Sequence, residues 1–268
     1  MPGFSLFPSR YYLYSLVAFV CLLLSACGST QTGLRALDTH QSSAHGSRVR
    51  YIVLHYTAGS YTRSLQTLTG PDVSAHYLIS DHHPPKLHRL LSEDRRAWHA
   101  GLGSWYGNTD INTGSIGIEI VNHGQLGPDQ WDPYSPEQIE LLRLLLNDLV
   151  HRHQIAPQNI IGHSDMAPQR KIDPGPLFPW EQLAQSGLGR WYDEKKSLAL
   201  QAHYLTHPFP SVTAQQQLLL DAGYEVELTG QADTATRNVI AAFQMHYRPT
   251  RYDGIMDAET LSILLSLH

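Results

Sequence analysis

Hydrophobic and other residues alternate along residues 115–121, as they do in a β-strand with one buried face. One face carries Ile116, Ile118 and Ile120, and the other carries Gly117, Glu119 and Val121. Shorter apolar runs predict three more strands, at residues 51–56, 74–80 and 160–162. The run at 51–56 leads into a turn at 57–59, and the run at 160–162 leads into a loop.

One amphipathic helix is predicted after residue 135. Ser135 can serve as its N-cap, Pro136 suits the first helical position, and Gln138 can complete a capping box. Apolar residues then recur every three or four positions, at Ile139, Leu142, Leu145, Leu146, Leu149 and Val150. Because strands precede and follow this helix, we expect an α/β domain over residues 49–185.

The C-terminal part contains a near-repeat. Residues 230–236 (GQADTAT) recur as residues 254–260 (GIMDAET), and in each copy an aspartate after a glycine turn can cap a helix. A further helix is predicted at 214–222, before a glycine stop. We therefore expect a small all-α, three-helix domain at 211–268, joined by a connector at 186–210 with room for one helix.

Residues 1–26 are interpreted as a lipoprotein signal peptide. An uncharged apolar run at 11–24, too short to span a bilayer comfortably, ends in the tetrapeptide LSAC. This resembles a bacterial lipobox, in which cleavage before the cysteine exposes Cys27 for acylation; an ordinary signal peptide or a short buried helix is the alternative. A polar, flexible tether follows at 27–48. By resemblance to the sorting rules of enteric-type bacteria, Gly28 favours the outer membrane, with the protein facing the periplasm.

Composition narrows the classes of protein. The 268 residues are 42% hydrophobic and 16% charged, which is typical of a globular chain. A net charge of −5 without a strongly basic stripe argues against a nucleic-acid partner. Two cysteines are too few for a disulfide scaffold, and the 16 histidines are a surplus that raises the question of metal binding.

Three dispersed residues are candidate zinc ligands. His55 ends the first predicted strand, His163 follows the last one, and Asp173 lies ten residues further on. Two imidazoles and one carboxylate match the three protein ligands of a catalytic zinc site, which leaves one position for water. Their spacing alone leaves open the alternative of ordinary loop histidines and a capping aspartate.

Two charged residues are candidates for catalysis. Glu119 lies in an isoleucine-rich strand, where a carboxylate is costly unless it is paired or functional, so it is either a general base or half of a buried salt bridge. Lys171 could aim its ammonium group at the same cavity and stabilise an oxyanion. Its alternative is an ordinary solvated loop lysine.

Five ordered blocks strengthen these assignments. They are VLHYTAG at 53–59, SAHYLI at 74–79, WHAG at 98–101, SIGIEIVN at 115–122 and IGHSDMAPQRKIDPGP at 161–176. Together they resemble the zinc N-acetylmuramoyl-L-alanine amidases of the type 2 family, which are related to peptidoglycan recognition proteins. With its lipobox, the whole chain is similar to the outer-membrane lipoprotein amidases of enteric-type bacteria. Residues 211–268 are similar to peptidoglycan-binding three-helix domains.

The resemblance implies a mixed β-sheet flanked by helices and one zinc ion per chain. The zinc ligands would be His55, His163 and Asp173. Glu119 would position and deprotonate the water on zinc, and Lys171 would polarise the scissile carbonyl. The matching blocks also make His76, Trp98 and His99 candidate substrate-binding residues, with a structural role as the alternative for His76.

The function implied is hydrolysis of the amide between N-acetylmuramic acid, or its anhydro form, and the L-Ala of the peptidoglycan stem peptide, in cell-wall turnover and recycling. We expect a monomer whose partners are its peptidoglycan or muropeptide substrate and, through Cys27, a membrane. Two alternatives stay open: a non-catalytic peptidoglycan recognition protein, of a kind that typically lacks a zinc ligand, and a zinc peptidase that cuts within the stem.

Overall fold

The computed structural model describes residues 39–40, 42–128 and 130–267. The predicted signal peptide and Cys27 lie outside these residues. Residues 46–268 form one compact unit, and every helix and strand of the described residues lies in it. No helix among the described residues is long and apolar enough to cross a membrane.

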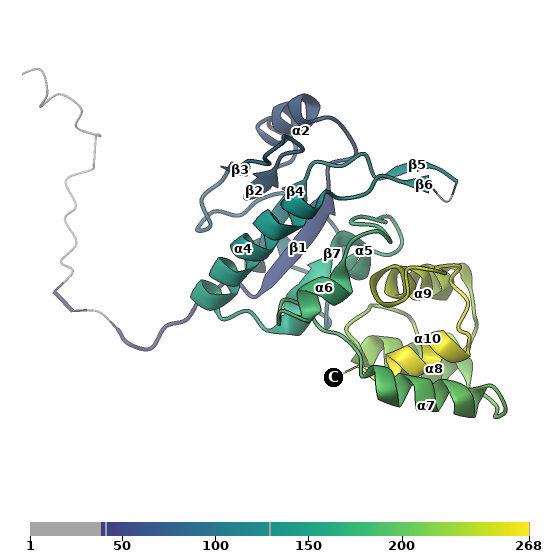
Figure 1. Ribbon diagram of the computed structural model, residues 1–268. Helices are drawn as coiled ribbons and strands as arrows, with labels where there is room; N and C mark the ends of the chain where they lie inside the picture. Colours follow the sequence, from purple (N-terminus) through teal and green to yellow (C-terminus); the bar gives the residue numbers. More distant parts are fainter. Residues whose placement is uncertain (1–38, 41, 129, 268) are drawn as a thin grey trace, which may run out of the picture. The chain divides into compact units, whose positions relative to one another are not determined.

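Within the described residues, a five-stranded mixed sheet has the order β3-β2-β4-β1-β7 (Figure 1). Neighbouring strands are parallel, except that β3 runs antiparallel to β2. The strands are β1 (Tyr51–Tyr56), β2 (Tyr77–Ile79), β3 (Leu87–Arg89), β4 (Ser115–Ile120) and β7 (Ile160–Gly162). The predictions for β1, β4 and β7 agree within one residue, whereas the predicted strand at 74–80 is extended only in its second half.

Helix α4 (Pro136–His153) covers one face of this sheet (Figure 1). The predicted capping box is present, because the Ser135 hydroxyl accepts from the Gln138 amide and the Gln138 side chain accepts from the Ser135 amide. The apolar stripe of α4 packs on the sheet in a cluster that includes Ile52, Leu54, Ile116, Ile118, Ile120, Ile139, Leu142 and Leu146. Since the isoleucines of β4 face α4, Gly117 and Glu119 point to the opposite side of the sheet.

Shorter elements complete this part of the chain and were not predicted. They are α2 (Tyr61–Leu68), α3 (Ile111–Gly114), β5 (Gln125–Gly127), β6 (Gln130–Trp131), the 3-10 helix η1 (Pro157–Asn159), α5 (His163–Met166) and α6 (Trp180–Ala184). Two of these helices begin close to the ends of central strands. Helix α2 comes directly after β1 and its turn, and α5 begins at the residue after β7.

The C-terminal helices are α8 (Val212–Asp221), α9 (Thr234–Tyr247) and α10 (Ala258–Leu264), and the connector forms α7 (Glu194–Tyr204), which packs against α10. The predicted caps are present, since Asp233 accepts from the Thr236 amide and Asp257 from the Thr260 amide. Two buried glutamines, one for each copy, explain why the glycine and threonine recur in the near-repeat. Gln216 bonds the Gly230 amide and the Thr236 hydroxyl, and Gln244 does the same for Gly254 and Thr260.

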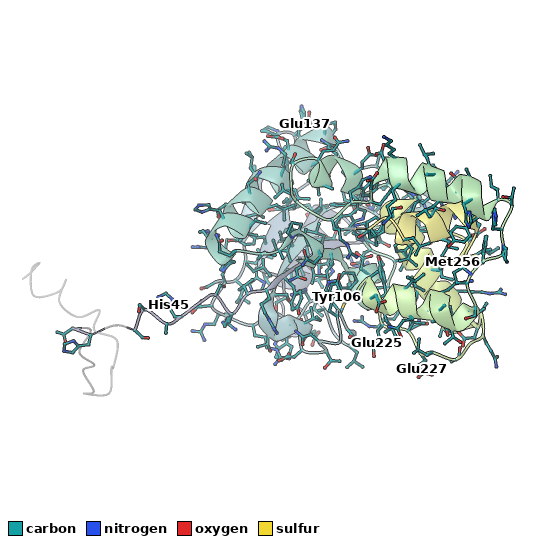
Figure 2. All side chains as sticks on the ribbon, turned by 90° about the horizontal axis from the view of Figure 1, so that it is seen from below. His45, Tyr106, Glu137, Glu225, Glu227 and Met256 are labelled. Carbon is teal, nitrogen blue, oxygen red and sulfur yellow. The ribbon has the colours of Figure 1, made fainter. Side chains whose placement is uncertain are left out.

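The helical part shares a hydrophobic core with the α/β part. One cluster joins Val53 of β1, Ile161 of β7 and Met166 of α5 to Phe243 of α9 and to Tyr224, which follows α8. In Figure 2, Tyr106 lies where the two parts meet; its amide donates to the Gly223 carbonyl, and its hydroxyl accepts from Arg190. The predicted fold class, a mixed sheet flanked by helices with a small all-α C-terminal domain, is confirmed, although its two parts are not separate cores.

Candidate metal centre and active site

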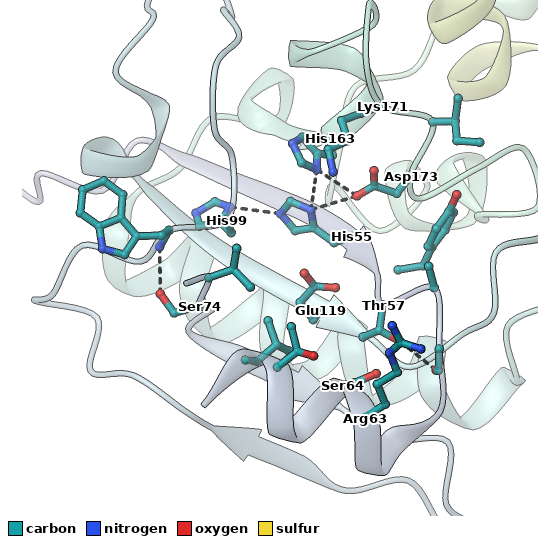
Figure 3. Close-up of a pocket in the computed structure, with 18 of the residues that line it drawn as sticks. His55, Thr57, Arg63, Ser64, Ser74, His99, Glu119, His163, Lys171 and Asp173 are labelled. Carbon is teal, nitrogen blue, oxygen red and sulfur yellow. Dashed lines mark hydrogen bonds and ion pairs between the residues drawn. The ribbon is translucent and has the colours of Figure 1, made fainter. Parts of the chain in front are cut away.

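His55, His163 and Asp173 converge at one end of the sheet. His55 lies near the end of β1, His163 opens α5 directly after the neighbouring strand β7, and Asp173 follows in the loop after α5. His55 Nδ1 lies 3.0 Å from His163 Nδ1 and 3.0 Å from Asp173 Oδ2, and the third side of this triangle, His163 Nδ1 to Asp173 Oδ2, is 3.1 Å (Figure 3). Parallel pairing of distant strands has therefore brought together the residues that the sequence singled out.

This donor set fits a divalent metal. Ligands at the ordinary distance of about 2.0–2.1 Å in a tetrahedral zinc site lie about 3.3 Å from one another, close to the spacing of the triangle. All three side chains are buried. Hydrogen bonds alone cannot join all three atoms, because each atom would need a proton to share with the other two. A cation between them would instead be bound by one lone pair from each atom.

The outer ring nitrogens of both histidines are held in place. His163 Nε2 lies 2.9 Å from the carbonyl oxygen of Ala100, to which its N–H can donate, and this leaves Nδ1 free as a ligand. His55 Nε2 lies 3.1 Å from His99 Nδ1, and His99 Nε2 lies 3.0 Å from the Ser115 hydroxyl. Both contacts favour the tautomer with its proton on Nε2, which a metal bound at Nδ1 requires.

The pKa values of His55 and Asp173 favour a neutral imidazole at His55 beside an ionised carboxylate. Burial, together with the charge of His163, lowers the pKa of His55 to about 4. Burial alone would raise the pKa of Asp173, but the charges and hydrogen bonds of His163 and His55 hold it well below its usual value. Two imidazole nitrogens and one carboxylate oxygen are a ligand set that suits zinc.

Glu119 lies beside this centre and forms no side-chain hydrogen bond or ion pair with any other residue that the structure describes. It is paired in register with His55 across β4 and β1, and its side chain points into the cavity below His55 (Figure 3). Its Oε2 atom is buried with no hydrogen-bond partner among the described residues. Burial, with a further contribution from the charge of Asp173, raises the pKa of Glu119 well above its ordinary value. Since Glu119 forms no salt bridge among the described residues, a role in catalysis explains its position in the cavity better than a structural one.

The cavity has a volume of about 600 Å³. Its lining includes the metal-site residues and Glu119, and also Trp98, His99 and Lys171. Trp98 is 52% exposed at its edge, where its ring can contact a ligand. The positive charge of Lys171 partly opposes the rise in the pKa of Glu119 and adds to the fall in the pKa of His55, both of which are caused mainly by burial. Apart from His76, the predicted metal, catalytic and substrate-binding residues therefore line one cavity.

His76 is placed differently from the other candidates. It is fully buried, its Nδ1 accepts from the Gly117 amide, and its Nε2 lies 3.2 Å from the Arg95 carbonyl. It is not part of the cavity lining, which favours its structural alternative.

His99 lines the cavity and also contacts His55. Its ring packs against Gly117, where an added Cβ atom would lie only 2.4 Å from the ring. This glycine leaves the space that the ring of His99 fills.

Two arginines at the cavity were not predicted. Arg170 is tied to the carbonyl oxygens of Ala100 and Leu102. Arg63, on α2, is exposed and forms no ion pair among the residues that the structure describes. The short helix α2 carries no signal in the sequence that would place it at the cavity, and so Arg63 was missed.

Comparison with known proteins gives two family matches. Residues 45–176 match the family described as N-acetylmuramoyl-L-alanine amidase, and residues 210–264 match the family described as putative peptidoglycan binding domain. The chain is 41% identical over 259 residues to N-acetylmuramoyl-L-alanine amidase AmiD of Escherichia coli K12, covering 92% of this chain and 94% of that one.

Solved structures agree with these matches. The E. coli AmiD complex with the substrate anhydro-N-acetylmuramic acid-L-Ala-D-gamma-Glu-L-Lys has a TM-score of 0.77 at 40% identity, covering 88% of this chain and 95% of that one. AMPDH3 from Pseudomonas aeruginosa, in complex with anhydromuramic pentapeptide, has a TM-score of 0.80 at 35% identity, covering 88% of this chain and 98% of that one.

Proposed function

Because the chain belongs to the N-acetylmuramoyl-L-alanine amidase family, we propose that the cavity around His55, His163 and Asp173 is its active site and holds one zinc ion. The enzyme cleaves the amide bond between N-acetylmuramic acid and the L-Ala of the peptidoglycan stem peptide. The observation that supports this site most strongly is the triangle of three buried donor atoms 3.0–3.1 Å apart, beside the buried Glu119 Oε2, which has no hydrogen-bond partner among the described residues. Both similar complexes contain an anhydro-muramyl compound, so we include the anhydro form among the proposed substrates.

Each residue of the site has a proposed task. Zinc at this site supplies Lewis acidity, which polarises a carbonyl and lowers the pKa of water. Glu119 accepts the proton of the attacking water, which its raised pKa favours, and returns it to the amine that leaves as the N-terminus of L-Ala. Lys171 places its positive charge next to the carbonyl oxygen of the scissile amide, on which negative charge develops during the attack. Trp98 and His99 line the wall against which the substrate lies.

Hydrolysis products distinguish this proposal from its two alternatives. We would incubate the protein with anhydro-N-acetylmuramic acid-L-Ala-D-γ-Glu-L-Lys, with and without a chelator, and identify the products by mass spectrometry. The expected products are the free sugar and the intact peptide, formed only without chelator. Fragments cut between amino acids would instead indicate a peptidase, and an unchanged substrate would indicate a recognition protein.

Arg63 is expected to recognise the stem peptide. A γ-linked glutamate keeps its α-carboxylate free, and Arg63 is an exposed cation at the cavity without an ion pair among the described residues. Since a hydrogen bond to a charged group contributes about 1.5–3 kcal/mol, Arg63→Ala should raise KM about tenfold or more with little change in kcat. Steady-state kinetics test this. With a substrate whose α-carboxylate is amidated, wild type and variant should have similar KM values; an equal loss on both substrates would contradict a carboxylate contact.

We also propose that the protein is a monomer, is anchored in the outer membrane by acyl chains on Cys27 and acts from its periplasmic side in wall turnover. Two or three acyl chains hold a protein on a membrane stably, whereas one does not. Changing Cys27 to alanine should therefore move the protein from the membrane fraction to the soluble fraction and abolish labelling with palmitate. Continued membrane association without labelling would contradict the lipid anchor.

A further inference from the structure

A buried carboxylate next to a proposed metal ligand is held by the C-terminal domain. Asp165 lies two residues after His163, within α5, and its side chain is 1% exposed. Its Oδ2 accepts from the Gly162 amide at 2.7 Å and contacts His246 Nδ1 at 2.8 Å. Its Oδ1 accepts from the Tyr224 hydroxyl at 2.7 Å. Two of the three groups that hold this carboxylate therefore come from the C-terminal domain.

Asp165 in turn fixes the start of α5. A helix of four residues cannot hold its own geometry, because it has too few internal hydrogen bonds. The bond from the Gly162 amide to Asp165 closes its first turn, at the peptide next to His163. The Ser164 amide donates to the Asp173 carbonyl oxygen at 2.8 Å. The backbone positions of two proposed metal ligands, His163 and Asp173, thus depend on this one short helix.

His246 is placed for this contact. Its ring stacks on Trp180 with centroids 3.9 Å apart and an angle of 10° between the planes, and it also stacks on Tyr247. Its second ring nitrogen, Nε2, is buried with no hydrogen-bond partner among the described residues. An apolar ring would pack equally well there, so the contact with Asp165 is what explains a histidine.

From these contacts we propose that Tyr224 and His246 are positioning residues for the metal centre, acting through Asp165 on His163. This rests on the proposed zinc site. The C-terminal domain then has a second role beyond contact with peptidoglycan: it completes the support that orients the metal ligands. Groups that hydrogen-bond a metal ligand directly typically contribute about 10- to 100-fold to metal affinity, so we expect about 10-fold for Tyr224 and His246, which act through Asp165.

Tyr224→Phe tests the proposal with the smallest change, because it keeps the buried ring and removes only the hydroxyl. Tyr247→Phe is its matched control. Tyr247 is buried in the same domain, and its hydroxyl forms its side-chain hydrogen bond with Arg190, whereas Asp165 acts on it only through its charge. We would measure the zinc dissociation constant of the full chain by competition with a chelator, and the melting temperature of the zinc-free protein. His246→Phe, which keeps the stacking on Trp180, is a second variant.

The proposal expects zinc affinity to fall about 10-fold in Tyr224→Phe and His246→Phe and to stay at the wild-type value in Tyr247→Phe. Wild-type affinity in both Tyr224→Phe and His246→Phe would overturn it, even if their melting temperatures fell, since the contacts would then be merely structural. An equal loss of affinity in Tyr247→Phe would overturn it as well. A wild-type protein that binds no zinc would overturn the proposed function itself, and this inference with it.

Discussion

Replacing Glu119 with glutamine is expected to lower kcat by about 10²- to 10⁴-fold, the usual contribution of a positioned general base. The amide of glutamine has the size of the carboxylate but cannot accept a proton from water. The fold gives no other reason for the loss, because Glu119 Oε2 makes no hydrogen bond among the described residues that the change could break. Zinc content should remain at the wild-type level, since Glu119 is not one of the three converging donors.

Kinetics on a muramyl peptide and metal analysis of the same preparation check this result. Glu137→Gln is the matched control, because Glu137 is an exposed residue in the first turn of α4 (Figure 2), and its change should leave kcat unaltered. If Glu119→Gln kept most of its turnover, the base would have to be another group. If it lost zinc along with activity, Glu119 would belong to the metal site instead.

Changing Asp173 to alanine should abolish both zinc binding and activity at ordinary zinc concentrations. Zinc sites with three or four ligands bind with about 10–16 kcal/mol, so that each ligand contributes about 3–4 kcal/mol and the loss of one weakens affinity by roughly 10²- to 10³-fold. The change also removes the only anionic group of the triangle. The two imidazoles of His55 and His163 would then face each other at 3.0 Å without the carboxylate between them.

Thermal unfolding provides a readout that does not depend on activity. A metal that binds only the folded state stabilises it by about 2.7 kcal/mol when present at 100 times its dissociation constant. Zinc should therefore raise the melting temperature of the wild type, and the same concentration should leave Asp173→Ala almost unchanged. Asp72→Ala, at an exposed carboxylate outside the cavity lining, should respond to zinc as the wild type does. A full zinc response in Asp173→Ala would remove Asp173 from the ligand set.

The sequence predicted the elements with strong periodicity and missed the short ones. The alternation along β4 and the stripe of α4 each extend over several residues, so that their buried faces could be identified before the structure was known. Helix α5 has four residues, about one turn, which is too few for a period to appear. Strand β3 reads Leu-His-Arg and is largely exposed, so it carries no apolar signal either.

The site could be predicted as a set of residues but not as an arrangement. Matching blocks singled out His55, Glu119 and His163, yet nothing in a single sequence shows that β1 lies between β4 and β7. That order is what places the three side chains at one end of the sheet. The contact of His99 with His55 and the place of Arg63 at the cavity could not be foreseen for the same reason, since both depend on how distant segments pack.

The C-terminal domain shows the same limit on a larger scale. Its caps and its repeat could be predicted from local residues, and both are present. Tyr224 and His246 gave no local signal of their own, because a buried residue looks the same in a sequence whether it packs within its domain or against another. Only the structure shows that Asp165 is the residue they hold.

The distance along the chain between the proposed ligands has a consequence for the order of folding. His55 is 108 residues from His163 and 118 from Asp173, so the three come together only after β1 has paired with β7. Pairing of strands that far apart is slow, because a long loop must close first. A metal ion can then be captured at full affinity only late, by chains that are already nearly native. For an N-acetylmuramoyl-L-alanine amidase, activity would thus begin only once folding is complete.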